Sequence, residues 1–275
     1  MPPPPCADAR PPGGGRPAGA PAGPPVDPAL LDFAVGVARA AGESTLRWFQ
    51  AADLAVDHKA DGTPVTAADR AAERLVRARL ATAFPEDGVL GEEEPELAGS
   101  SGRRWTVDPI DGTKAFTRGV PLYSTLLALD DEHGPALGVI ALPALRQVVY
   151  AGRGRGAWWD GRRAQVSATA SLAGAYLSSS SYSHWPEEQL LAVKRAGCEL
   201  RTWGDGYGYA LVATGRLDAM VDPVVELYDV APAPVIMSEA GGRFTDLGGR
   251  PGAGGGSGVA TNGRIHDDLL ALLGG

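Results

Sequence analysis

Two aspartates three residues apart, Asp108 and Asp111, follow an apolar run and precede residues able to begin a helix. Both carboxylates are therefore expected at the end of a strand. Pro109 fixes one φ angle and Gly112 permits a close or left-handed turn, so the two carboxylates and the Ile110 carbonyl can converge on one hard cation. Because oxygen ligands suit Mg²⁺, the segment predicts a magnesium site.

The turn after these aspartates is suited to an anion. The backbone N–H groups of Gly112 and Thr113 would have no partner within the following helix, and the helix dipole favours negative charge at the same end. A phosphate group would then share the turn with the metal ion. The alternative is a solvated turn, since Asp and Gly are the usual turn residues.

Further carboxylates lie in two distant segments. Glu92 belongs to the acidic run 91–94, which would otherwise be a solvated loop, and Asp229 opens a helical segment, where it could serve as an N-cap. Carboxylates from separate turns would repel each other strongly at one place unless Mg²⁺ ions neutralised them, as in two-metal phosphoryl-transfer sites. Spacing along the chain leaves both interpretations open.

Hydrophobic periodicity predicts the elements that position these segments. A helix is expected from Pro28, where apolar residues recur with a period near 3.6. A second helix is expected from Thr66, with Asp69 at the capping-box position, and Pro85 ends it. Strand-like runs that should form one sheet follow at 123–129, 136–142 and 147–151.

The second half alternates shorter strands with helical stretches, and Asp160-Gly161 predicts a hairpin turn at its start. The helical stretches are expected at 186–197, 206–214 and 230–240. Without a repeat or a linker, we expect one layered domain over 27–275, with an α+β half at 27–160 and an α/β half at 161–275. Residues 1–26 are mostly Pro, Gly, Ala and Arg, which predicts a disordered tail.

The composition restricts the classes of partner. The chain has 275 residues, of which 44% are hydrophobic and 21% charged, typical of a soluble globular protein. A net charge of -8 without a basic block disfavours nucleic-acid binding. Two cysteines, Cys6 and Cys198, favour a reducing cytoplasm over a disulfide framework, and no apolar stretch is long enough for a bilayer. We therefore expect a cytoplasmic protein with neither nucleic-acid nor membrane partners.

Five segments share their order and spacing with a known enzyme family. They are Lys59-Ala-Asp-Gly-Thr-Pro-Val-Thr-Ala-Ala-Asp-Arg70, Gly91-Glu-Glu-Glu94, Trp105-Thr-Val-Asp-Pro-Ile-Asp-Gly-Thr113, Tyr228-Asp-Val-Ala231 and Glu239-Ala-Gly-Gly242. Together they resemble the inositol monophosphatase family, over about Pro28 to Leu273. The resemblance implies an αβαβα sandwich, between α+β and α/β in class, that is usually dimeric. It also implies a phosphatase of small phosphate monoesters with two or three Mg²⁺ ions, commonly inhibited by lithium.

The same resemblance implies roles for individual residues. It makes metal ligands of Glu92, Asp108, the Ile110 carbonyl, Asp111 and Asp229. It places phosphate against the amides of Gly112 and Thr113, and it makes Asp69 a further acidic residue of the site. In the family mechanism, a water activated by the metal and oriented by Glu92 and Thr113 attacks phosphorus in line, without a phosphoenzyme. This agrees with the general chemistry of metal ions, which lower the pKa of bound water and stabilise the charge that develops on the transferred phosphoryl group.

Two further segments narrow the substrate within the family. Thr113-Lys-Ala-Phe-Thr-Arg-Gly-Val-Pro121 resembles the histidinol-phosphatase branch, which usually reads T-K-x-F-x-R-G-x-P, and so does the G-D-x-x-x-Y pattern at 204–209. Histidinol phosphate carries an amine and an imidazole, so Asp205, with Asp222 as a further acid, would favour it over a neutral polyol. Asp205 could equally be a helix N-cap.

Several alternatives remain open from the sequence. Lys114 and Arg118 either attract the phosphate dianion or are ordinary surface charges. Inositol monophosphate, fructose 1,6-bisphosphate and nucleotide 3'-phosphates are alternative substrates, because the metal motifs suit all of them. A regulatory member of the fold without activity is the non-enzymatic alternative, and the intact acidic residues argue against it.

Overall fold

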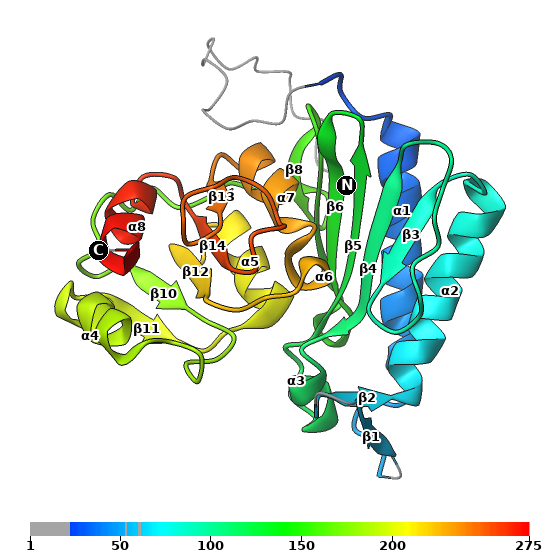
Figure 1. Ribbon diagram of the computed structural model, residues 1–275, viewed down its shortest axis with the longest axis horizontal. Helices are drawn as coiled ribbons and strands as arrows, with labels where there is room; N and C mark the ends of the chain where they lie inside the picture. The colour runs from blue at the N-terminus through cyan, green and yellow to red at the C-terminus, as the bar shows by residue number, and fades with distance from the viewer. Residues whose placement is uncertain (1–22, 53, 60–61, 275) are drawn as a thin grey trace, which may run out of the picture.

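The computed structural model describes residues 23–52, 54–59 and 62–274. In these residues, two large β-sheets alternate with three layers of helices (Figure 1). The predicted αβαβα sandwich is therefore confirmed. No helix of the described ranges combines the length and the apolar character needed to cross a bilayer.

The larger sheet has seven strands in the order β3-β4-β5-β6-β7-β8-β9 in the described part of the chain. Their bounds are β3 Gly88–Gly91, β4 Arg104–Asp111, β5 Ser124–Asp131, β6 Gly134–Leu142, β7 Gln147–Gly152, β8 Gly156–Trp159 and β9 Arg162–Arg163. β3 and β4 run parallel, and the other neighbours pair antiparallel. The three runs predicted to share a sheet are β5, β6 and β7, and Asp160-Gly161 forms the predicted turn between β8 and β9.

Two long helices, α1 (Pro28–Thr45) and α2 (Ala67–Ala83), cover the outer face of this sheet (Figure 1). The predicted capping box begins α2: the Thr66 hydroxyl accepts a hydrogen bond from the Ala68 N–H at 3.1 Å, and Asp69 accepts one from the Thr66 N–H at 2.7 Å. The apolar faces of both helices pack on β4 to β7 in one buried cluster. These contacts hold the start of α2 beside the end of β4.

The smaller sheet has five strands in the order β11-β10-β12-β14-β13 among the described residues. Their bounds are β10 Tyr176–Ser178, β11 Glu199–Arg201, β12 Ala219–Asp222, β13 Arg243–Thr245 and β14 Gly258–Thr261. Between the two sheets lie α5 (Asp205–Ala213), α6 (Leu227–Val230) and α7 (Ala233–Glu239), and the far face is covered by α4 (Glu187–Arg195) and α8 (His266–Gly274) (Figure 1). The buried cluster around α5 and α7 joins the two sheets.

The predicted helical stretch 230–240 is interrupted in the structure. α6 ends at Val230 and α7 begins at Ala233, because Pro232 lacks the N–H that would continue one helix. The backbone of Pro232 packs directly on β6 at Gly138, where an added Cβ would lie 2.6 Å from the Pro232 carbonyl oxygen. This contact fixes the segment between α6 and α7 against the larger sheet.

The predicted tail, 1–26, lies outside the described residues up to residue 22. Its last residues, in contrast to the prediction, pack on the fold: Val26 is 6% exposed and donates a hydrogen bond to the Arg153 carbonyl at 2.9 Å. The Arg153 guanidinium in turn donates to the Pro24 carbonyl at 2.9 Å. Residues 23–26 differ from the prediction because Val26 adds apolar surface to the core beside α1.

Candidate functional site

Three carboxylates form the centre of the site. Asp108 and Asp111 lie at the end of β4 and Asp229 lies in α6, and one carboxylate oxygen from each falls within 4.8 Å of the others. Residues three apart face opposite sides of a regular strand. The β4–β5 register shifts between Asp108 and Asp111, and this irregularity re-aims the strand so that both aspartates reach one place.

Asp111 is held by donors from two other elements. Its Oδ2 accepts hydrogen bonds from the Ser124 hydroxyl at 2.6 Å and from the Gly206 N–H at 2.5 Å. A Cβ at position 206 would lie 2.3 Å from the Ser124 oxygen and 2.7 Å from Asp111 Oδ2, so this approach requires glycine. Both bonds use the same oxygen, and Oδ1 is the atom available to a cation.

After Asp111 the chain turns into the short helix α3 (Thr113–Thr117). Gly112 has a φ of 85°, the left-handed conformation that the sequence predicted. The Thr113 hydroxyl donates to the Ile110 carbonyl at 3.0 Å, and the Ile110 side chain is buried beneath α3. Since the first N–H groups of a helix have no partner within it, this turn can bind an anion beside the carboxylates.

Asp229 is the third residue of α6, and Glu226 is its N-cap, so the interpretation of Asp229 as an N-cap is wrong. Its Oδ2 accepts a hydrogen bond from the Glu226 N–H at 2.8 Å. A carboxylate has two oxygens, so this bond is compatible with a place in the acidic cluster.

Glu92 lies beside the three carboxylates and is paired with a lysine. Lys59 Nζ is 2.7 Å from Glu92 Oε1 and 2.7 Å from Glu93 Oε1. Burial opposes the charge on Lys59, but the hydrogen bonds and attraction of the two glutamates outweigh it and raise its pKa. Both glutamate side chains are largely buried, so the acidic run is not a solvated loop.

The environment disfavours joint ionisation of these acids. Burial, followed by repulsion from three neighbouring carboxylates, raises the pKa of Asp108 well above its ordinary value, and burial chiefly raises that of Asp111. Burial is also the first cause that raises the pKa of Glu92 to about 7 and that of Asp229 to about 6. Asp108 Oδ1 is buried without a hydrogen-bond partner. A divalent cation would relieve the repulsion and give this oxygen a partner, so the residues fit a metal ion.

Asp69 completes the capping box of α2. Its Oδ2 accepts hydrogen bonds from the backbone N–H and the hydroxyl of Thr66 at 2.7 and 2.6 Å, while its buried Oδ1 has no hydrogen-bond partner. The adjacent Ala68 packs with Ile110 and Phe116, so Asp69 lies in the helical turn behind α3.

Asp205 approaches the site from the other side. It is the first residue of α5, with a φ of 55°, and its N–H donates to the Ser180 hydroxyl at 2.8 Å. Gly204 occupies the N-cap position, so the N-cap interpretation of Asp205 is wrong. A Cβ at Gly112 would lie 2.9 Å from Asp205 Oδ2, which places this carboxylate directly against the turn suited to an anion.

Asp222 is 4% exposed, and protein donors use both of its oxygens. Oδ1 accepts hydrogen bonds from the Ser179 hydroxyl at 3.1 Å and the Ser180 N–H at 2.8 Å, and Oδ2 from the hydroxyls of Ser180 at 3.0 Å and Tyr209 at 2.9 Å. Ser180 therefore links Asp222 to Asp205. Burial, then Asp222, raises the pKa of Asp205 to about 6.

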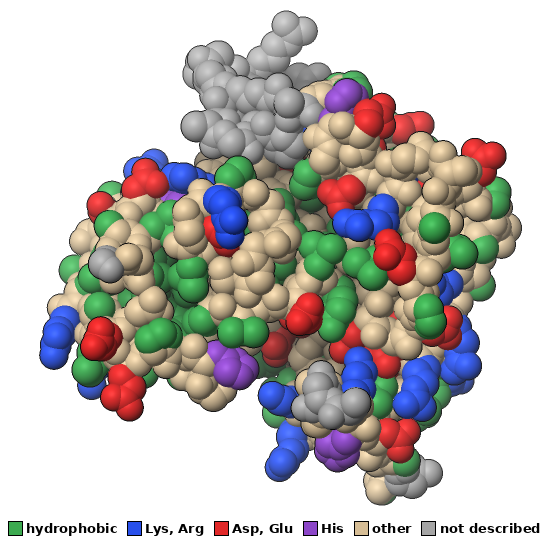
Figure 2. All heavy atoms as spheres, viewed as in Figure 1, with side chains coloured by type: hydrophobic (Ala, Val, Ile, Leu, Met, Phe, Trp, Pro, Cys, Tyr) green, Lys and Arg blue, Asp and Glu red, His purple; other side chains and the backbone are tan. Residues whose placement is uncertain are grey.

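The acidic cluster has a basic neighbourhood. Figure 2 shows acidic side chains in the hollow between the two halves, and Lys and Arg side chains gathered below it, over α3 and the hairpin of β1 (Val56–His58) and β2 (Pro64–Thr66). Lys114 on α3 and Arg118 just after it are exposed. Their positions suit attraction of an anion toward the hollow.

The chain matches the inositol monophosphatase family over residues 28–273. The chain belongs to this family. It is 45% identical to the histidinol-phosphatase of Mycobacterium tuberculosis over 252 residues, 88% of this chain and 97% of the relative, and 41% identical to that of Streptomyces coelicolor over 256 residues, 88% and 96%. The extragenic suppressor protein SuhB from Bartonella henselae has a similar structure, with a TM-score of 0.83 and 31% identity over 89% of this chain and 98% of that one.

Membership of the inositol monophosphatase family makes this protein a metal-dependent phosphoric monoester hydrolase.

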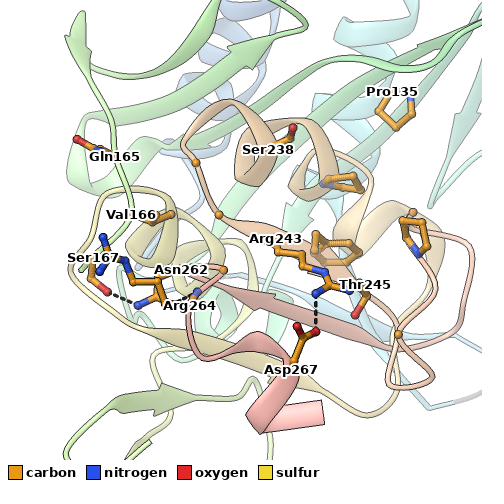
Figure 3. A pocket seen from close by; sticks show the side chains of 18 of the residues that line it. Pro135, Gln165, Val166, Ser167, Ser238, Arg243, Thr245, Asn262, Arg264 and Asp267 are labelled. Atoms are coloured by element: carbon orange, nitrogen blue, oxygen red, sulfur yellow. Dashed lines mark hydrogen bonds and ion pairs between the residues drawn. The ribbon is translucent and has the colours of Figure 1, made fainter. Parts of the chain in front are cut away.

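A separate cavity of about 850 Å³ lies beside α7 and β13, and none of the three clustered carboxylates is among the described residues that line it (Figure 3). Its Arg243 is paired with Asp267 at 2.5 Å, and its Asn262 donates to the Ser167 hydroxyl at 2.9 Å. The three carboxylates that could hold a metal ion therefore lie apart from this cavity.

We expect the metal-free phosphatase to lose stability as the pH rises. A group whose pKa is higher in the folded than in the unfolded state binds more protons when folded, so its contribution is complete below the unfolded pKa and is lost through the folded pKa. Glu92 shifts from 4.5 to about 7 and Asp229 from 3.8 to about 6. The metal-free melting temperature should fall across this window, and added Mg²⁺ should raise it most at the upper end.

Melting temperatures with and without Mg²⁺ at each pH measure this effect. His266 opposes it, because burial lowers its pKa from 6.5 to about 4 and stability is lost as the pH falls through that range. The contribution of His266 is the same with and without Mg²⁺, so it cancels when the two melting temperatures at one pH are compared. In the double variant Glu92→Gln and Asp229→Asn, the rise in melting temperature caused by Mg²⁺ should depend less on pH. A rise that is independent of pH in the unaltered protein would contradict the place of these two acids at the metal site.

Proposed function

We propose that the protein hydrolyses histidinol phosphate to histidinol and inorganic phosphate, a step of histidine biosynthesis, with Mg²⁺ as its metal. The identity of 45% and 41% with two histidinol-phosphatases, each over 88% of this chain, carries the proposal. The segment 113–121, which follows the T-K-x-F-x-R-G-x-P pattern, supports it.

The Asp205 carboxylate can form an ion pair with a positively charged leaving group. The carboxylate lies against the turn at Gly112, where the phosphate would bind, so the organic part of a short ester would lie within its reach. The amine or the imidazolium of histidinol would pair with this carboxylate, whereas a neutral polyol would offer only hydroxyl groups. Asp222 would orient Ser180, and through it Asp205, without touching the substrate.

The proposed metal ligands are Glu92, Asp108, the Ile110 carbonyl, Asp111 and Asp229. Mg²⁺ bound there would supply an activated water and stabilise the charge that develops on the phosphoryl group. Glu92, largely buried beside Asp108, would orient this water for attack on phosphorus. The Thr113 hydroxyl, held by the Ile110 carbonyl, would orient the same water.

The other residues would bind and orient the phosphate. The amides of Gly112 and Thr113 would donate to its oxygens, and Lys114 and Arg118 would raise the local concentration of the dianion. Asp69 would support the site from α2 with its unpartnered Oδ1. We further propose two or three Mg²⁺ ions, inhibition by lithium, and a cytoplasmic homodimer without nucleic-acid or membrane partners, on the likeness to the family.

A panel of phosphate esters tests this proposal. With Mg²⁺ present, kcat/KM for histidinol phosphate should exceed that for inositol 1-phosphate, fructose 1,6-bisphosphate and adenosine 3'-phosphate by about 10-fold to 100-fold, because a hydrogen bond to a charged group is worth about 1.5–3 kcal/mol. Faster cleavage of inositol 1-phosphate would contradict histidinol phosphate as the substrate but would still agree with phosphatase activity. Absence of hydrolysis of every ester would favour the regulatory alternative.

A further inference from the structure

Glu73, in α2, is a fully buried carboxylate that the proposed chemistry does not use. Its Oε2 accepts a hydrogen bond from the Glu93 N–H at 2.8 Å, and its Oε1 accepts from the Glu94 N–H at 3.1 Å and from Arg77 Nε at 2.8 Å. Arg77 also donates to the Glu94 carbonyl at 2.9 Å. The pair therefore binds the main chain of the turn that follows Glu92.

The residue before Glu92 rests on the same carboxylate. Gly91 ends β3, and a Cβ there would lie 2.0 Å from Glu73 Oε1 and 2.8 Å from Oε2. The main chain on both sides of Glu92 is thus anchored to Glu73, by close contact at Gly91 and by hydrogen bonds at the next two amides. Moving the Glu92 backbone would break charge-assisted hydrogen bonds in a buried place, where they are strong.

The Glu92 side chain reaches from this anchored main chain to groups on two other elements. Lys59 Nζ, in the β1–β2 hairpin outside the larger sheet, donates to Glu92 Oε1 at 2.7 Å, and the Asp108 carboxyl on β4 also interacts with this side chain. The main-chain anchor therefore sets how far the Glu92 carboxylate reaches toward Asp108, whose pKa shift includes repulsion from it.

We propose that Glu73 is a positioning residue that holds Glu92 at the metal site. The inference rests on the proposed role of Glu92 as a metal ligand and adds a residue that none of the sequence motifs identified. Loss of such outer partners usually weakens metal binding without removing a ligand. Glu73 acts here through the peptide groups of the neighbouring residues.

Glu73→Gln tests the proposal with little change in volume. Glutamine offers one oxygen, so its NH₂ group would face one of the donors that the carboxylate now binds. Mg²⁺ affinity, measured by calorimetric titration without substrate, should fall about 10-fold to 100-fold. The kcat at saturating Mg²⁺ should fall less than the affinity, because a high metal concentration refills a weakened site.

Glu239→Gln is the matched control. Glu239 also binds two main-chain amides of a turn, those of Gly154 and Gly156 at 2.7 and 2.6 Å, but it lies at the end of α7, away from the carboxylates. It should lower the melting temperature and leave Mg²⁺ affinity unchanged. An equal loss of affinity in both variants would overturn the inference, because general destabilisation would then explain the effect.

A double-mutant cycle separates the inference from the proposed function. If Glu73 acts through Glu92, then the double variant should bind Mg²⁺ less than about twofold more weakly than Glu92→Gln alone. Additive losses, or normal affinity in Glu73→Gln alone, overturn the inference. Normal affinity in Glu92→Gln overturns the ligand role first, and the inference with it. If Glu73→Gln does not fold, Gly91→Ala tests the same contact, and normal affinity in that variant counts against it.

Discussion

Asp108→Asn should abolish phosphate release and, unlike most core substitutions, stabilise the metal-free protein. Asparagine has nearly the same shape, but it removes a charge that burial and three neighbouring carboxylates disfavour. Loss of a metal ligand removes several kcal/mol of transition-state stabilisation, so kcat/KM should fall about 10³-fold or more. Phosphate release with Mg²⁺ and the melting temperature without metal ions measure the two effects.

Asp87→Asn is the control for this variant. Asp87 is also buried, but it accepts hydrogen bonds from Ser101, Arg103 and the Trp105 indole in a network around the start of β4. This variant should lower the melting temperature and retain activity below it. Metal-dependent turnover by Asp108→Asn, or a melting temperature that falls in both variants without metal, would show that Asp108 has a structural role.

Asp205→Asn should change substrate preference more than it changes catalysis. kcat/KM for histidinol phosphate should fall about 10-fold to 100-fold, because the variant loses a charge-assisted interaction of about 1.5–3 kcal/mol. kcat/KM for inositol 1-phosphate should change less than about threefold, since a neutral polyol has no charge to pair. Asparagine tolerates the φ of 55° at this position, so the start of α5 should be retained.

Asp160→Asn is a matched control, because Asp160 also has a positive φ, 46°, in the β8–β9 turn away from the site. It should leave both substrates unaffected. An equal fall for both esters in Asp205→Asn would contradict a specificity role. It would instead indicate that the change displaces the neighbouring Gly206, whose N–H holds Asp111.

The local features of this protein were predictable from its sequence. The capping box of Thr66 and Asp69, the left-handed turn at Gly112 and the two aspartates at the end of β4 each depend on residues within a few positions of one another. Steric limits on φ and short-range hydrogen bonds determine such features, and both act between residues that are close in the sequence.

The structure departs from two local expectations where distant contacts decide the backbone. The sequence left Asp205 open as a substrate-binding residue or an N-cap, and the N-cap alternative is wrong, because its N–H bonds to Ser180 and its side chain meets Gly112. Val26 was assigned to the tail, but its N–H bonds to Arg153, and composition alone carries no signal for that bond. In both cases the partner lies at least 25 positions away along the chain.

The partners of the site residues depended on the tertiary structure. Asp111 is held by Ser124 and Gly206, residue types that carry no recognisable catalytic pattern, and the bond to Gly206 spans 95 positions. Lys59, which pairs with Glu92, and Glu73, which binds the next amide along the chain, lie in other elements than Glu92. The sequence determined which acids were present and how each turn was shaped. Packing of α5 to α7 between the two sheets decided which of them meet, because the free energy of burying that apolar core offsets the repulsion between the carboxylates that it brings together.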